Sequence, residues 1–450
     1  MVDKILETIK THNMIQEGDT IIIGLSGGPD SLALTNVLYT LKDQLKVSLV
    51  AVHINHLLRG EAADADERFV KSYCDERSIP CFIFRKNIAQ IAEQMKLSFE
   101  EAGRNARYDA FDWVARSYSS YKIAVAHNKN DISETFFINL MRGAGIDGLS
   151  SIDYFRDNHI IRPLLECARF EIEAYCRVCN LTPRIDHTNH ENHYLRNKIR
   201  NQLIPKMDEI FEMDSVDAIF RSTEILKNEK AFIQKHIETI YNQVSVQEND
   251  SIAIELSSFN RLSNAEKYHL IRLCIKKMRG HLTNISYDRI TRIANLKRVG
   301  AMIEIDACFS VRLGSDKLYF YNASKLKLEN QTLRSGDLKV RNVSKSELGS
   351  YKLSNTQVAI DADKIVGKLS IRNRQSGDIF VPLGMKGNKK VKSFFIDEKV
   401  PFIRRDQLRL VCDEEKIIWI EDMRISDLVK ISSDTKNICI MTFQELVELD

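Results

Sequence analysis

The sequence predicts an α/β fold for the first part of the chain, a doubly wound parallel sheet with helices on both faces. Two observations support this prediction. Short apolar runs alternate with segments whose apolar residues recur at helical spacing. The first of these runs ends in a glycine-containing turn that leads directly into a helical segment. Because 450 residues exceed the size of a single ordinary core, further domains are expected after this one.

Short runs of β-branched and other apolar residues give the expected strands of this domain. After the first run, apolar residues recur every three or four positions from Leu32 to Leu41, which predicts a helix. A short strand near Ile160, a helix over residues 169–179 and a charged helix over residues 194–209 would complete a first domain, residues 1–212. The other strands are expected over residues 20–25, 47–53, 81–84 and 123–126.

The rest of the chain changes pattern twice. Helical periodicity with few glycines or prolines continues to about Lys297, and strand-like alternation over residues 301–321 then predicts a hairpin. We therefore expect a mainly helical second domain with a β-hairpin, residues 213–335, and a linker inside the polar stretch 323–354. The last part, residues 355–450, is expected to be a small β-rich α+β domain with one short basic helix.

Composition is that of a globular protein, with 44% hydrophobic and 28% charged residues. The net charge of +3 is far below that of a protein that coats nucleic acid without discrimination, so any such contact must come from local basic patches. Nine cysteines without framework spacing predict a cytoplasmic protein. No apolar run approaches the ~18 to 20 residues of a membrane span, so no membrane partner is expected. The oligomeric state, a homodimer included, is left open.

A candidate phosphate-binding loop follows the first expected strand directly. A tight turn between a strand and a helix directs several backbone N–H groups to one place, where the positive end of the helix dipole also lies. A carboxylate in this turn would repel a polyphosphate unless a divalent cation lay between them, which favours Mg²⁺ at Asp30. Turn formation alone is the alternative, and the loop lacks the Gly-Lys-Ser/Thr of a Walker motif. The predicted ATP-binding loop is Ser26, Gly27, Gly28, Pro29, Asp30 and Ser31.

Polar residues also follow the second and fourth expected strands, at the carboxyl edge where doubly wound folds bind ligands. His53 and His56 are three apart, but no carboxylate or cysteine sits at matching spacing, so a nucleotide-side loop is favoured over zinc. Asp131 and Glu134 are three apart at a helix start, so both carboxylates can face the same edge. For Asp131, a simple N-cap is the alternative.

Basic residues gather in three places that suit phosphate binding. Two pairs of arginines lie about one helical turn apart, and a group of lysines is interleaved with glycines and aromatic residues near the C-terminus. A solvated charged surface is the alternative for each. The residues are Arg104 and Arg107, Arg196 and Arg200, and Lys389, Lys390 and Lys392.

Cys176 and Cys179 form a Cys-x-x-Cys that is followed by three histidines. Zinc binding or sulfur handling is one interpretation. Because the cysteines fall inside a helix-like segment rather than a zinc-knuckle turn, we favour partly buried small apolar residues instead. The histidines are His187, His190 and His193.

The loop at residues 26–31 resembles the PP-loop of the ATP pyrophosphatases, whose members cleave ATP between the α and β phosphates and transfer AMP to an oxygen. Within this class, further segments are similar to the lysidine synthetase family over nearly all of the chain. Two positions depart from the family pattern, Gly103 in place of Ala and Asn130 in place of Asp. The matching segments are His53 to Arg59, Glu101 to Tyr108, His127 to Thr135, Arg142 to Gly145, Asp186 to Asn189, Arg196 to Arg200, and Ile371 to Asp397 with Trp419.

The resemblance implies the ligation of lysine to carbon-2 of the first anticodon cytidine of tRNA(Ile), through an adenylated tRNA, with ATP and Mg²⁺. It implies catalytic roles for Asp30, Asp131 and Glu134, with Mg²⁺ near Asp30 and Asp131. We expect Asp131 and Glu134 to bind the lysine cation and take its proton. ATP would contact the loop and His53. The implied tRNA or phosphate contacts are Arg104, His127, Arg142, Arg196, Arg200, Lys389, Lys390 and Lys392.

Three other functions remain as alternatives. A tRNA thiolation enzyme would need cysteines at the reaction edge, and none lies beside Ser26, His53 or His127 in the sequence. A tRNA-binding protein with a disabled site is motivated only by Asn130. A small-molecule amidating enzyme of the same fold would have little use for a basic C-terminal domain.

Overall fold

The computed structural model describes residues 1–58, 60–184, 195–248, 251–324, 338–348, 357–400 and 402–443. Arg59, the Asp186–Asn189 segment, the three histidines of the candidate zinc site and most of the expected linker lie outside these residues. The chain divides into two compact units, Met1–Ile233 and Gln234–Asp450. The division falls inside helix α11 (Ser215–Val244) rather than before it. The start of α11 packs on the first unit, where Asp217 accepts a hydrogen bond from Lys129 at 2.9 Å.

The first unit contains a six-stranded sheet in the order β3-β2-β1-β4-β6-β5. All neighbours pair in parallel except β5, which runs antiparallel to β6 at the edge. The predicted doubly wound sheet is therefore confirmed, with the expected strands shifted only at their ends. The strands are β1 (Thr20–Gly24), β2 (Ser48–Asn55), β3 (Cys81–Arg85), β4 (Tyr121–Ala124), β5 (Phe155–Arg156) and β6 (Ile160–Ile161).

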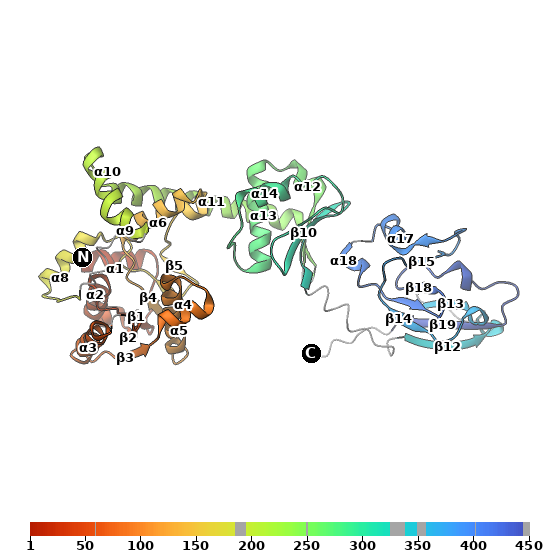
Figure 1. Ribbon diagram of the computed structural model, residues 1–450, viewed down its shortest axis with the longest axis horizontal. Helices are drawn as coiled ribbons and strands as arrows, with labels where there is room; N and C mark the ends of the chain where they lie inside the picture. Colours follow the sequence, from red (N-terminus) through yellow and green to blue (C-terminus); the bar gives the residue numbers. More distant parts are fainter. Residues whose placement is uncertain are drawn as a thin grey trace. The chain divides into compact units, whose positions relative to one another are not determined.

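Helices cover both faces of this sheet, which is why its central strands are apolar throughout. Ile21 and Ile23 of β1 pack with one group of helices, and Ile22 packs on the opposite face with Val50 and helix α5. The two groups are visible on either side of the sheet in Figure 1. One face carries α1 (Val2–Thr11), α2 (Pro29–Leu45), α3 (Glu61–Asp75) and α8 (Arg169–Val178), and the other α4 (Ile88–Met95) and α5 (Phe99–Ala115).

After β4, helix α6 (Lys129–Met141) leaves the carboxyl edge of the sheet and packs against a helical segment that comes much later in the chain. That segment begins at Leu195 and includes a π-helical turn, so side chains one turn apart can meet α6. The remaining elements here are α7 (Ile146–Leu149), α9 (Leu195–Lys198), the π-helical turn Ile199–Leu203 and α10 (Ile204–Phe211).

The second unit begins with helices and a five-stranded sheet in the order β7-β8-β11-β10-β9. The predicted hairpin is confirmed, because β10 and β11 pair antiparallel around Gly314. The helical pattern expected to about residue 297 is interrupted by β7 and β8, since β8 pairs with β11. The elements are β7 (Ser245–Glu248), β8 (Ser251–Glu255), α12 (Leu256–Arg261), α13 (Asn264–Arg279), α14 (Tyr287–Ala294), β9 (Met302–Glu304), β10 (Phe309–Leu313) and β11 (Lys317–Asn322).

The C-terminal part is β-rich with short helices, as predicted. Its sheets have the orders β12-β19-β13, β14-β17-β18 and β15-β16. Across the described ranges, no helix is both long and apolar enough to span a membrane. The elements are β12 (Leu338–Ser344), α16 (Lys345–Leu348), β13 (Gln357–Asp361), β14 (Ser370–Arg372), β15 (Ile379–Phe380), β16 (Lys389–Lys390), α17 (Val391–Asp397), α18 (Phe402–Arg405), β17 (Leu410–Cys412), β18 (Ile417–Ile420) and β19 (Asn437–Phe443).

Candidate active site

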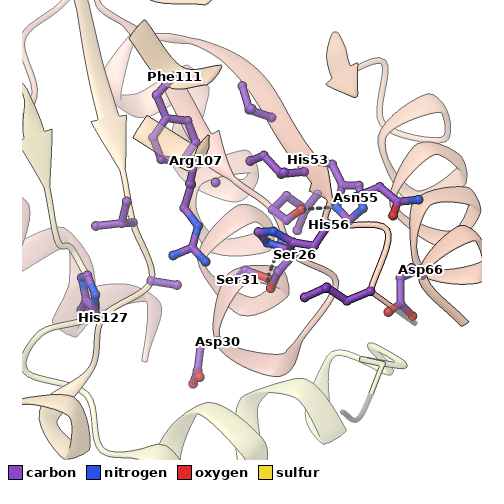
Figure 2. Close-up of a pocket in the computed structure, with 18 residues that line it drawn as sticks. Ser26, Asp30, Ser31, His53, Asn55, His56, Asp66, Arg107, Phe111 and His127 are labelled. Carbon is purple, nitrogen blue, oxygen red and sulfur yellow. Dashed lines mark hydrogen bonds between the residues drawn. The ribbon is translucent and has the colours of Figure 1, made fainter. Parts of the chain in front are cut away.

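A cavity of about 590 Å³ opens at the carboxyl edge of the first unit's sheet (Figure 2). The loops after β1, β2 and β4 meet there, because parallel strands bring their carboxyl ends to one edge. Its volume is within the range of sites for small ligands. Of the residues predicted for the site, the structure brings Ser26, Asp30, Ser31, His53 and His127 into the wall of this cavity.

The loop after β1 is tied together by its two serines. The Ser31 hydroxyl lies 3.0 Å from that of Ser26 and accepts the Ser26 backbone N–H at 3.1 Å. Gly27 has a φ of +88°, a conformation that favours glycine. Gly28 is the N-cap of α2 and brings no capping side chain, so the first N–H groups of the helix are left for an anion. Gly27, Gly28 and Pro29 therefore shape the loop without lining the cavity.

Asp30 lies in the first turn of α2 with two polar neighbours. The side-chain amide of Asn128 donates to its Oδ1 at 3.0 Å, and Arg169 Nη2 lies 3.5 Å from its Oδ2. Burial raises the pKa of Asp30 to about 6, and the negative charge of Asp131 adds to the rise while Arg169 opposes it. Because burial disfavours the ionised form of Asp30, a nearby cation would stabilise that form.

The described residues contain no group of three side chains suited to hold a metal ion by themselves. Magnesium commonly binds through one or two carboxylates and completes its shell with substrate phosphates and water. Asp30 and Asp131 fit that partial role, because their two negative charges lie close enough to interact and Asp30 belongs to the loop after β1.

The predicted lysine-binding carboxylates and the predicted tRNA clamp meet in one ion-pair cluster. Arg196 Nε donates to Glu134 at 2.6 Å, and Arg200 contacts both oxygens of the same carboxylate at 2.5 and 3.0 Å. Arg196 also donates to Asp131 at 3.2 Å. Glu134 is fully buried, whereas the Asp131 side chain is 14% exposed. None of the four residues lines the cavity.

This cluster changes two expectations. The oxygens of Glu134 are already occupied by two guanidinium groups, so Glu134 is not free to take a proton from lysine. The charges of Arg196 and Arg200 are likewise matched within the protein, so they do not form an open phosphate clamp in this structure. Residue spacing within each segment cannot show that α6 and the Arg196 segment face each other.

Two histidines of the cavity wall have opposite hydrogen-bonding roles. His53 Nδ1 lies 2.8 Å from the carbonyl oxygen of Leu25, so it carries the proton and leaves Nε2 as an acceptor. Arg162 Nε donates to His127 Nδ1 at 3.2 Å, so in His127 the proton is on Nε2. Burial lowers the pKa of both rings, and the charges of Arg162 and Arg196 lower that of His127 further. The wall of the cavity therefore has one neutral acceptor, Nε2 of His53, and one neutral donor, Nε2–H of His127.

Arg107 reaches the cavity, while the predicted Arg104 does not. Figure 2 shows Arg107 pointing from α5 into the space between His127 and Ser31, below Phe111. Helical spacing placed both arginines on one flank but could not decide which would face the cavity. Arg162 and Asn128 are also site residues that sequence motifs did not single out, because their contacts join segments far apart in the chain.

Asn130, which departs from the family pattern, has a structural contact. Its side-chain oxygen accepts the backbone N–H of Arg169 at 2.9 Å, at the start of α8. A carboxylate would accept the same bond, so the amide keeps this link with one charge fewer beside Asp30 and Asp131.

The remaining predicted contacts lie at the surface of their own units. Arg142 is exposed just after α6. Lys390 and Lys392 are exposed, but Lys389 is ion-paired with Asp397 and lies over the Phe394 ring.

The Cys-x-x-Cys pair divides between core and surface. Cys176 is 3% exposed within the core cluster, which confirms its interpretation as an apolar residue. Cys179 is exposed beyond the end of α8, so the same interpretation was wrong there.

Comparisons with known proteins find relatives that match this chain over nearly its whole length. Residues 2–207 match a family model described as a PP-loop domain, and residues 369–441 match one described as the TilS substrate C-terminal domain. The tRNA(Ile)-lysidine synthase of Caldanaerobacter subterraneus subsp. tengcongensis is 37% identical, over 98% of this chain and 97% of the relative. That of Clostridioides difficile is 36% identical, over 99% of each. Among solved structures, the U34-tRNA thiolase NcsA from Methanococcus maripaludis is similar with a TM-score of 0.42 and 19% identity, over 50% of this chain and 78% of that one, too low a likeness to bear on function.

Proposed function

The chain belongs to the tRNA(Ile)-lysidine synthase family, and on that premise we propose how its residues carry out the family's ATP-dependent ligation of lysine to tRNA(Ile). The oxygen at carbon-2 of the first anticodon cytidine attacks the α-phosphate of ATP, and the bond to pyrophosphate breaks. The lysine ε-amine then attacks carbon-2 and expels AMP. The products are lysidine, AMP and pyrophosphate, and protons leave the amine along the way.

The loop after β1 binds the departing pyrophosphate. The uncapped N-terminus of α2 supplies backbone N–H groups, and Ser26 and Ser31 add hydroxyls at hydrogen-bonding distance from each other. These donors are in place before the bond breaks, so they stabilise the charge that develops on the leaving group. Mg²⁺, when bound beside Asp30 and Asp131, would offset the charge of the phosphates.

The nucleotides occupy the cavity beside this loop. His53 offers a neutral acceptor and His127 a neutral donor, and neither adds a charge that would bind pyrophosphate in competition with the loop. Arg107 is the one arginine or lysine among the described residues of the cavity wall, and we assign it to the phosphate that stays with the nucleotide as AMP.

Lysine binding is assigned to Asp131, with Glu134 as a positioning residue. Asp131 is the partly exposed carboxylate of the ion-pair cluster, and it lies beside Asp30, which faces the cavity. Glu134 holds Arg196 and Arg200 in place, and these arginines in turn contact Asp131. The amine must lose a proton before it attacks carbon-2, and Asp131 accepts that proton in this proposal.

Exposed cations on both units bind the tRNA body, because the base must leave its stack to enter the cavity. The contacts are assigned to Arg142 in the first unit and to Lys390 and Lys392 in the second. We place the reaction in the cytoplasm, where tRNA, lysine and ATP occur together and the nine free cysteines stay reduced.

The observation that carries this proposal is the convergence of Ser26, Asp30, Ser31, His53 and His127 on one cavity in a chain with full-length synthase relatives. Incubation with radiolabelled lysine, ATP and a panel of tRNAs tests it. Label should enter only tRNA(Ile) with a cytidine-first anticodon and only with ATP. Label in no tRNA, or in all of them, would contradict it. The thiolation alternative is disfavoured because the described wall of the cavity contains no cysteine.

A further inference from the structure

A second cavity, of about 330 Å³, lies beside helix α5 and is basic. Its wall includes Lys86 after β3, Arg104 of α5 and Arg156 of β5, with Asp109 as the only carboxylate among its described residues. Hence three positive charges from three elements meet one negative charge. We call it the α5 basic cavity.

The guanidinium groups of both arginines of this cavity lie over the ring of Tyr108. The guanidinium carbon of Arg156 lies 4.4 Å from the centre of the Tyr108 ring, and that of Arg104 lies 5.3 Å from it. Stacking of this kind leaves the N–H edges of a guanidinium available to an anion. Arg156 shares one N–H with the exposed Asp157, whereas neither Arg104 nor Lys86 has an ion-pair partner among the described residues.

The α5 basic cavity lies close to the reaction cavity because one helix lines both. Arg107 and Phe111 of α5 face the reaction cavity, and Arg104 and Tyr108 face the basic one. Residues three apart on a helix have Cβ atoms only about 5–6 Å apart. A strand of RNA whose base enters the reaction cavity therefore has its sugar–phosphate backbone within reach of these cations.

We propose that the α5 basic cavity binds phosphodiester groups of the tRNA that flank the nucleotide held in the reaction cavity. This inference rests on the proposed function and deepens it. A base removed from its stack must be held by its backbone, and phosphate contacts position a nucleic acid without reading its sequence. The stacked arginines and Lys86 supply such contacts in a fixed geometry, independent of the ATP-binding loop.

Salt dependence of tRNA affinity tests the proposal with the full-length protein. The double variant Lys86→Gln with Arg156→Gln removes two cations of the α5 basic cavity. Neither forms an ion pair with a buried residue among the described residues. Each lost phosphate contact makes the negative slope of log K against log salt shallower by roughly 0.7–0.9, so the double variant should reduce its magnitude by about 1.5 and weaken binding at least about tenfold. Lys42→Gln is the matched control, because Lys42 also lies over a tyrosine ring but on α2, on the other face of the sheet.

A neutral phosphate analogue locates the contact. Methylphosphonate groups on either side of the first anticodon nucleotide should weaken tRNA binding to the wild-type protein and to the Lys42→Gln variant, but have little further effect on the double variant. Unchanged thermal unfolding and ATP affinity of the double variant are expected, since it touches neither core nor loop. The inference would be overturned if the methylphosphonate groups weakened binding to the double variant as much as to the wild-type protein. It would also be overturned if the double variant bound tRNA as tightly as the Lys42→Gln control. Wild-type protein that ligates no lysine would instead count against the proposed function.

Discussion

The side-chain amide of Asn128 donates a hydrogen bond to Oδ1 of Asp30 over 3.0 Å, and so joins two loops that lie 98 residues apart in the chain. The same side chain accepts the backbone N–H groups of Asn130 and Asp131. Its backbone N–H donates to the Asp131 carboxylate at 3.0 Å. Asn128 is fully buried, and through these four bonds it sets the spacing between the two carboxylates of the site.

Replacing Asn128 by alanine should therefore damage both stability and activity. Loss of an N-cap costs about 0.5–2 kcal/mol, and Asp30 loses a hydrogen bond in addition. We expect kcat for lysine ligation to fall at least about tenfold, because the carboxylates of Asp30 and Asp131 are no longer held at a fixed spacing. The control is Asn87→Ala, which removes an N-cap from α4 in the same unit without touching Asp30. Equal kcat in the two variants would contradict the assigned role.

The raised pKa of Asp30 should make the free energy of unfolding depend on pH. Because the folded-state pKa is about 6 and the ordinary value is 3.8, the folded chain binds more protons than the unfolded chain between these values. The free energy of unfolding therefore falls as pH rises through this window. Asp30→Asn should be inactive yet more stable than wild type at pH 7.5, by up to about 3 kcal/mol, and the gain should vanish below about pH 4. Urea unfolding at both pH values measures this, and a less stable variant at pH 7.5 would refute it.

Glu134 should matter mainly for the ion-pair cluster. Removing one partner of a buried pair leaves uncompensated charge and typically costs 3–5 kcal/mol. We expect Glu134→Gln to lose about 3 kcal/mol of unfolding free energy, since the amide carries no charge to offset Arg196 and Arg200 and keeps only one of the two acceptor oxygens. Glu171→Gln serves as the control, because its partner Lys4 is partly exposed and such pairs contribute at most about 1 kcal/mol. Similar unfolding midpoints for both variants in urea would rule out this role.

Asp131→Asn separates lysine chemistry from tRNA binding. The amide can still accept the Asn128 backbone N–H, so the start of α6 should remain formed. Without the carboxylate, the lysine amine loses its counter-charge and its proton acceptor, and turnover should be abolished. The affinity for tRNA, measured by filter binding, should stay within about threefold of wild type, less than 0.7 kcal/mol. Undiminished turnover would remove Asp131 from the mechanism.

Arg162→Met tests the tautomer of His127. Arg162 can only donate, so its removal frees His127 Nδ1 and lets the ring proton exchange between both nitrogens. We expect ¹⁵N spectra of the imidazole to show a single Nε2–H tautomer in wild type and a mixture in the variant, with kcat reduced more than KM. Arg77→Met, which removes an arginine that lies over the Tyr73 ring and does not contact His127, is the control. An unchanged ¹⁵N pattern in Arg162→Met would show that the contact does not fix the ring.

Much of the first unit could be predicted because its strands are locally distinctive. The run Ile21–Ile23 is β-branched and buried on both faces, and a glycine turn and a helix follow it directly. Strands β7 and β8 could not be predicted in the same way. Ile252 and Ile254 alternate over a very short segment between two helices, and that segment becomes a strand only by pairing with β11, about sixty residues later.

The candidate site shows the same division. Ser26, Asp30 and His127 follow strands, and His53 lies near the carboxyl end of β2, so their meeting at one edge could be predicted from strand order alone. The contacts Asn128–Asp30, Arg162–His127 and Arg200–Glu134 join residues 98, 35 and 66 positions apart, and spacing along one element contains no sign of them. Spacing on α5 likewise identified an arginine flank but not that Arg107, rather than Arg104, faces the cavity.

The central claim is that the tRNA receives AMP while pyrophosphate leaves through the loop after β1. The most direct measurement incubates the full-length protein with ATP labelled at the α-phosphate and unmodified cytidine-first tRNA(Ile), without lysine. The label should appear on the tRNA and be released as AMP when lysine is added, and ATP labelled at the γ-phosphate should leave no label on the tRNA. Label that never reaches the tRNA, or that appears on lysine instead, would contradict the claim.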